Sequence, residues 1–124
     1  MFTLKQRPAA VLAGITATLS MAAFQASAHA KLESTTPKAN SSVSSPKSIE
    51  VHFSEGIETK LSSLKLAMND GTAVSVMSMT DTRDPATLSI MPNAKLKAGT
   101  YKVTWSVVSD DGHKTEGTFS FTVQ

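Results

Sequence analysis

Apolar and polar residues alternate in short segments from about residue 48 to the end of the chain. A period of two predicts half-buried β-strands rather than helices. Six such strands are expected, at residues 48–53, 63–68, 73–76, 87–91, 101–107 and 118–123. The strongest is 101–107, because Tyr101, Val103, Trp105 and Val107 all fall on one face. Residues 55–65 leave room for a short turn but not for a long amphipathic helix.

Turn signals separate these strands, as in a small β-protein. Asn69-Asp70-Gly71 predicts a tight turn, and Pro92-Asn93 ends the strand before it. A further strand around residues 31–33 brings the count to about seven, which is typical of an immunoglobulin-like sandwich. Residues 96–101 ("LKAGTY") resemble the tyrosine corner of such folds. We therefore predict an all-β domain, an immunoglobulin-like β-sandwich or small barrel.

The start of the chain has the pattern of an export signal. Lys5 and Arg7 precede an uncharged apolar run at residues 9–24, and Ala26-Ser27-Ala28 is a small-residue cleavage site. An uncleaved membrane anchor is the alternative, but the run is shorter than the roughly 20 residues that span a bilayer. We expect residues 1–28 to be a cleaved signal peptide and residues 29–124 to form one domain.

Cleavage changes the charge of the protein. The full chain has 12 Lys+Arg against 10 Asp+Glu, a formal charge of +2, but Lys5 and Arg7 leave with the signal. The remaining 96 residues are formally neutral, so their charge indicates no nucleic-acid partner. The chain also has no cysteine, which excludes disulfides and thiolate metal ligands.

Three histidines remain after cleavage: His29, His52 and His113. His52 is expected on the polar face of its strand, as a surface or hydrogen-bonded side chain. His113 follows Asp111 in "SDDGH", which is expected to be a turn between two strong strands. Alternation along an extended segment would place the two side chains on one side. An ordinary hairpin turn with an exposed histidine is the alternative.

Cleavage after Ala28 would make His29 the first residue, with a free α-amino group. Its amine and ring Nδ1 could chelate a metal ion, and Asp111 and His113 could complete the set. Three nitrogens and one oxygen favour Cu(II), with Zn(II) as the main rival. Binding should weaken as the pH falls, because the amine must be unprotonated. Glu55, at a strand end, is either a solvated acid or an acceptor that orients these ligands.

Three segments together resemble the CopC family of periplasmic copper-binding proteins: "HAKLESTTPKANS", "IEVHFSEGIE" and "LKAGTYKVTWSVVSDDGHKTEGTFSF". The resemblance implies a Greek-key β-sandwich or barrel that binds one Cu(II) near its N-terminus. The matching metal ligands are His29, Asp111 and His113, and Glu55 corresponds to an acid close to the metal. It further implies a monomeric periplasmic copper carrier or buffer, not an enzyme, with a CopD-type inner-membrane copper transporter as partner.

The methionines depart from some members of that family, which carry a methionine-rich Cu(I) loop. Here the region 68–79 holds three methionines and no histidine. Met77 and Met79 are expected to pack into the protein, and the chain to be a Cu(II)-only form.

Two other functions stay open. One is a copper redox enzyme of the N-terminal-histidine monooxygenase kind, and the other is an exported interaction module without metal.

Overall fold

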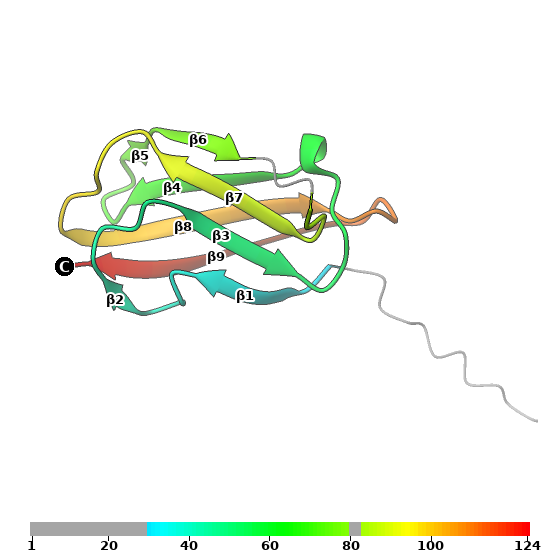
Figure 1. The fold of residues 1–124 in the computed structure, drawn as a ribbon, viewed down its shortest axis with the longest axis horizontal. Helices are drawn as coiled ribbons and strands as arrows, with labels where there is room; N and C mark the ends of the chain where they lie inside the picture. The colour runs from blue at the N-terminus through cyan, green and yellow to red at the C-terminus, as the bar shows by residue number, and fades with distance from the viewer. Residues whose placement is uncertain (1–29, 80–82) are drawn as a thin grey trace, which may run out of the picture.

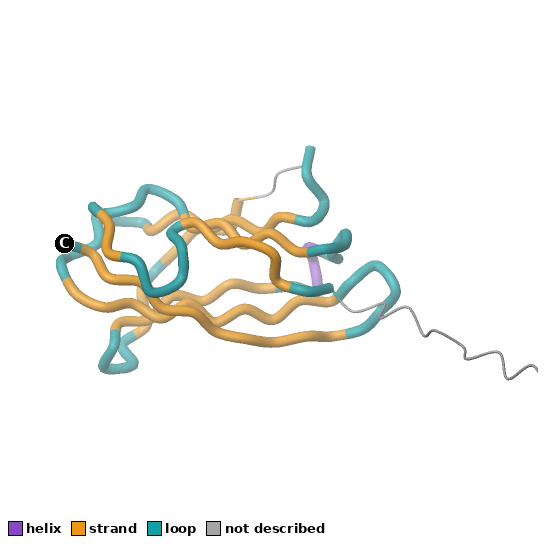
Figure 2. The backbone as a smooth tube through the Cα atoms, turned by 90° about the horizontal axis from the view of Figure 1, so that it is seen from below, coloured by secondary structure: helices purple, strands orange, loops and turns teal. Residues whose placement is uncertain are grey.

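Two β-sheets pack face to face in the computed structural model, which describes residues 30–79 and 83–124 (Figures 1 and 2). The first sheet has the order β1-β3-β7-β6. Its strands are β1 (Leu32–Thr36), β3 (Ile49–Phe53), β7 (Thr87–Pro92) and β6 (Val76–Met79). The second sheet has the order β2-β9-β8-β4-β5. Its strands are β2 (Ser42–Val43), β9 (Lys114–Val123), β8 (Gly99–Val108), β4 (Ser63–Met68) and β5 (Ala73–Val74).

The predicted all-β sandwich is therefore confirmed. Seven strands have four or more residues, and β2 and β5 add two residues each. The turn expected within residues 55–65 is a single 3₁₀ turn, η1 (Thr59–Leu61). In the described ranges, no helix is long and apolar enough to cross a bilayer.

The core follows from strand alternation. On β3, Ile49, Val51 and Phe53 are buried, whereas Glu50 and His52 point away from the core. The rings of Phe53 and Trp105 meet edge to face across the two sheets, with centroids 5.2 Å apart. The predicted tyrosine corner is present, because the Tyr101 hydroxyl donates to the carbonyl of Lys97 at 2.7 Å.

One predicted strand is divided between the sheets. Residues 73–76 split at Ser75, because β5 pairs with β4 whereas β6 pairs with β7. The expectation that Met77 and Met79 pack inward is wrong, since their exposures are 59% and 41%. Alternation along β6 turns Val76 toward the core, and the two methionines consequently face outward.

The start of the described chain and the β8–β9 turn lie at the same end of the sandwich. Figure 1 shows the beginning of β1, the end of β3 and the orange turn between β8 and β9 together at this end, opposite the C-terminus. Loops at the end of a rigid sandwich commonly carry function.

Candidate metal centre

The turn between β8 and β9 brings Asp111 and His113 together. Ser109 N–H donates to the carbonyl of His113 at 2.9 Å, and Gly112 N–H donates to the carbonyl of Ser109 at 2.8 Å. Gly112 has φ of +87°, a conformation that favours glycine. The turn expected between two strands is thus confirmed, but the extended alternation expected from Asp111 to His113 is wrong. The pairing itself is confirmed, with His113 Nδ1 3.0 Å from Asp111 Oδ2.

Two hydrogen bonds to one oxygen, Oδ1, hold the Asp111 carboxylate in place. The buried Ser109 hydroxyl donates to its Oδ1, which also accepts the backbone N–H of His113 at 3.1 Å. These hydrogen bonds, Ser109's first, lower the pKa of Asp111 to about 2. The carboxylate is therefore ionised at any neutral pH, and Oδ2 stays directed at the imidazole of His113. Both side chains remain open to solvent, with exposures of 30% and 56%.

The first described residues lie beside the start of β9, which follows this turn. Ala30 is buried, and its carbonyl accepts the hydroxyl of Thr115 at 3.3 Å. On the other side, Lys31 N–H donates to Ser54 Oγ at 2.9 Å, and Ser54 N–H donates to the Lys31 carbonyl at 2.8 Å. The chain at Ala30–Lys31 consequently runs between the start of β9 and the end of β3. His29 and the expected signal peptide, residues 1–28, lie outside the described residues.

The loop that contains Glu55 is attached to the same turn. Asp110 N–H donates to the Gly56 carbonyl at 3.1 Å, and Ile57 forms an isolated antiparallel bridge with Ser109. The Asp110 carboxylate occupies the space that a side chain at Gly56 would need. Glu55 is half-buried in this loop. The structure thus brings the Glu55 loop, the Asp111–His113 turn and the Ala30 segment to one place.

His52 belongs to a different region, as expected of a hydrogen-bonded surface histidine. Its Nδ1 lies 2.8 Å from Thr87 Oγ1, on the outer face of the first sheet. Asp84 and Glu33 flank the His52 ring. This arrangement was not predictable from the sequence, because no local pattern connects these three residues.

Ser109 is a further functional group that was not expected from the sequence. Its hydroxyl supports the Asp111 carboxylate from two residues away. The Ser-x-Asp spacing was the available signal, since in a tight turn a serine hydroxyl can reach a group two residues further along the chain.

Neither histidine region is a complete metal site within the described ranges. There, no group of three or more His, Asp or Glu side chains is arranged to hold a metal ion. Asp111 and His113 supply one oxygen and one nitrogen donor. Further donors at that turn have to come from another part of the chain or from water.

Comparison with known proteins gives a consistent result. A model of the CopC domain matches residues 32–124. Copper resistance protein C of Escherichia coli is 38% identical over 109 residues, which cover 82% of this chain and 86% of that protein. The protein of the same name from Pseudomonas syringae pv. tomato is 42% identical over 105 residues, covering 80% and 83%.

Solved structures match in fold as well. The crystal structure of PcoC, a methionine-rich copper resistance protein from Escherichia coli, superposes with a TM-score of 0.73 at 37% identity, covering 78% of this chain and all of that one. CopC from Methylosinus trichosporium OB3b gives a TM-score of 0.73 at 32% identity, covering 77% and 94%. With this fold, and with the family model spanning the whole sandwich, the chain belongs to the CopC family of copper resistance proteins.

Proposed function

We propose that the protein binds one Cu(II) ion at the end of the sandwich, through His29, Asp111 and His113. The observation that carries the proposal is the Asp111–His113 pair beside Ala30. The hydrogen bond to Thr115 holds Ala30 at a point two residues along the chain from His113, and His29 is covalently attached to Ala30. A cleavage after Ala28 would add the amine and Nδ1 of His29, giving four donors.

The spacing of the two described donors suits a square-planar ion. Two ligands about 2.0 Å from a metal and at a right angle to each other are about 2.8 Å apart. His113 Nδ1 and Asp111 Oδ2 are 3.0 Å apart, close to that separation. The low pKa of Asp111 means that no proton has to leave the carboxylate. Glu55 would lie near the metal and accept hydrogen bonds from its ligands.

The biological role that follows is a copper carrier or buffer. The relatives described above are named for copper resistance and not for a catalysed reaction. An anionic ligand in the metal plane favours retention of Cu(II) over redox turnover. We propose export to the periplasm, binding as a monomer, and transfer to or from a CopD-type membrane partner.

The test is a Cu(II) competition titration against chelators of graded strength. One sample is protein exported and trimmed by a cell, and the matched sample carries one extra residue before His29. The extension turns the amine into an amide, so we expect tight one-to-one binding only in the trimmed form. Equal binding in both would remove the His29 amine from the site, and absence of binding in both would refute the copper function.

A further inference from the structure

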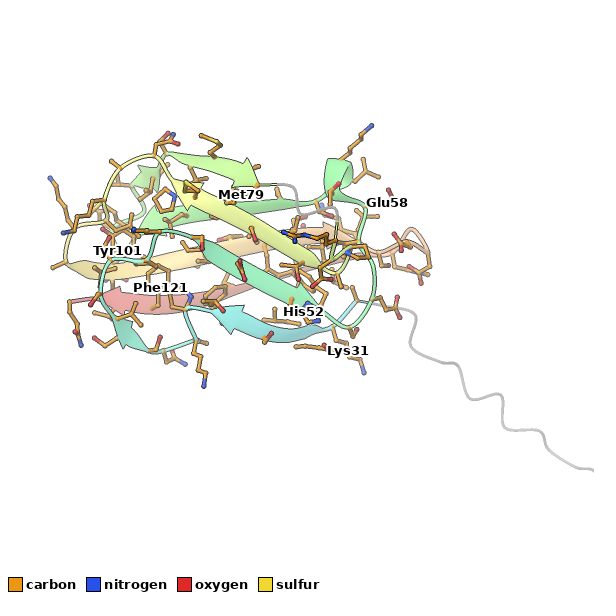
Figure 3. The ribbon with its side chains drawn as sticks, in the orientation of Figure 1. Lys31, His52, Glu58, Met79, Tyr101 and Phe121 are labelled. Carbon is orange, nitrogen blue, oxygen red and sulfur yellow. The ribbon has the colours of Figure 1, made fainter. Side chains whose placement is uncertain are left out.

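His52 lies between two acids on the outer face of the first sheet. Its Nδ1 is 3.3 Å from Asp84 Oδ2, and its Nε2 is 3.4 Å from Glu33 Oε2. The three residues come from three segments: Glu33 from β1, His52 from β3, and Asp84 from the turn before β7. Figure 3 places His52 on the part of β3 that lies toward the start of β1.

The hydrogen bonds around Nδ1 determine which ring nitrogen carries the proton. Asp84 accepts the Thr87 hydroxyl at 2.6 Å and the Ala86 N–H at 3.0 Å, and these bonds lower the pKa of Asp84. An ionised Asp84 only accepts, so Thr87 must donate its single proton to it. Thr87 Oγ1, 2.8 Å from Nδ1, is then an acceptor. Nδ1 therefore carries a hydrogen in the neutral ring.

That assignment leaves Nε2 with a lone pair directed toward the Glu33 carboxylate. The Nε2 lone pair and the Glu33 carboxylate, 3.4 Å apart, repel each other unless a cation lies between them. That cation is either a second proton on the ring or a metal ion. Metal-binding histidines usually donate their other ring N–H to a carboxylate, which fixes the tautomer. Asp84 and Thr87 supply that arrangement here.

The distance between the two acceptors fits a tetrahedral ion. With metal–ligand distances of about 2.0–2.1 Å, two ligands of a tetrahedral zinc ion are about 3.4 Å apart. Both side chains are open to solvent, with exposures of 38% for His52 and 53% for Glu33, so water can complete the coordination.

We infer that His52 Nε2 and the Glu33 carboxylate form a second, weaker site for a tetrahedral divalent ion such as Zn(II), with Asp84 and Thr87 orienting the ring. Only two protein ligands take part, so its affinity is expected to be far below that of a site with four protein donors. This site does not depend on copper binding at the β8–β9 turn.

The experiment is a Zn(II) titration of the trimmed protein at neutral pH, followed through the imidazole NMR signals of His52 and His113 separately. We expect the His52 signals to shift as Zn(II) is added and to stop shifting once one ion is bound at His52. Glu33→Gln should lower the Zn(II) affinity measured at His52 at least about tenfold. Asp84→Asn should lower it about tenfold, because carboxylates that orient a ligating histidine commonly contribute that much. Backbone spectra check that each variant keeps the fold.

Glu50→Gln is the matched control, since Glu50 lies two residues from His52 on the same face of β3. It should leave the His52 midpoint unchanged. Three results would each overturn the inference: His52 signals that Zn(II) does not move, an unchanged midpoint in Glu33→Gln, or a loss in Glu50→Gln as large as that in Glu33→Gln.

Discussion

The two histidine–aspartate pairs of this protein look alike at first. An aspartate oxygen lies 3.0 Å from Nδ1 of His113 and 3.3 Å from Nδ1 of His52. In each pair a hydroxyl group donates to the aspartate, from Ser109 in one and from Thr87 in the other. Both hydroxyls lower the pKa of the carboxylate that they contact.

The pairs differ in what surrounds them. Asp111 and His113 share one tight turn, and the chain at Ala30 lies beside it. The His52 pair is assembled from separate segments, and a second acid, Glu33, faces the other ring nitrogen. The same local chemistry thus supports two roles: at the turn we propose that the aspartate is itself a ligand, and on the sheet that it orients the histidine. Neighbouring segments decide which role applies.

The largest expected effect is loss of copper binding in His113→Ala. Removal of one nitrogen ligand should lower Cu(II) affinity by at least about 100-fold, more than the loss of an outer partner. His52→Ala is the matched control and should leave Cu(II) affinity nearly unchanged. Competition titrations measure the Cu(II) affinity of both variants. Equal losses in the two would contradict the different roles proposed for the two pairs.

The two supporting hydroxyls give a second, smaller test. Ser109→Ala should reduce Cu(II) affinity about tenfold, because Asp111 loses the bond that orients its carboxylate. The pKa of Asp111, followed by NMR, should rise from about 2 toward its ordinary value of 3.8. Thr87→Val removes the equivalent hydroxyl beside His52 and should leave copper binding intact. A Ser109→Ala protein with normal affinity would show that the turn holds Asp111 without this hydroxyl.

Gly56→Ala should have a modest effect on the turn. The added methyl group would collide with the Asp110 carboxylate, which can move because it is the end of a flexible side chain. The turn should shift slightly against the Glu55 loop, with a loss of Cu(II) affinity of about two- to fivefold. The His52 ring signals should stay in place, since His52 lies outside this contact. A shift of those signals would mean that the two regions are mechanically coupled.

The smallest effect concerns stability in acid. The pKa of Asp111 is lower in the folded protein than its ordinary 3.8, so its contribution to stability is present above pH 3.8 and is lost as the pH falls toward 2. Urea unfolding of the metal-free protein across this range should show a shallower pH dependence in Asp111→Asn. Asp110→Asn is the control. It removes the neighbouring carboxylate but keeps Asp111, the carboxylate that accepts the Ser109 hydroxyl. Parallel curves for Asp111→Asn and the unchanged protein would contradict the assignment.

Much of the fold was predictable because strand alternation is a local property. The spacing of Ile49, Val51 and Phe53 is sufficient to put His52 on the outer face of its strand. The tyrosine corner was predictable too, since Tyr101 and Lys97 are only four residues apart. The outward direction of Met77 and Met79 was not predictable, because alternation does not say which face of β6 meets the core.

Local patterns in the chain are enough to define the candidate copper ligands, the β-class of the domain and the residues that alternate into its core. Only the folded arrangement shows that the Asp111 carboxylate lies against the His113 ring, that Ala30 bonds to Thr115 across 85 residues, and that acids flank His52 on both sides. The physical reason is range. Periodicity and turn chemistry act between near neighbours in the chain, whereas contacts between distant segments depend on how the two sheets pair and pack.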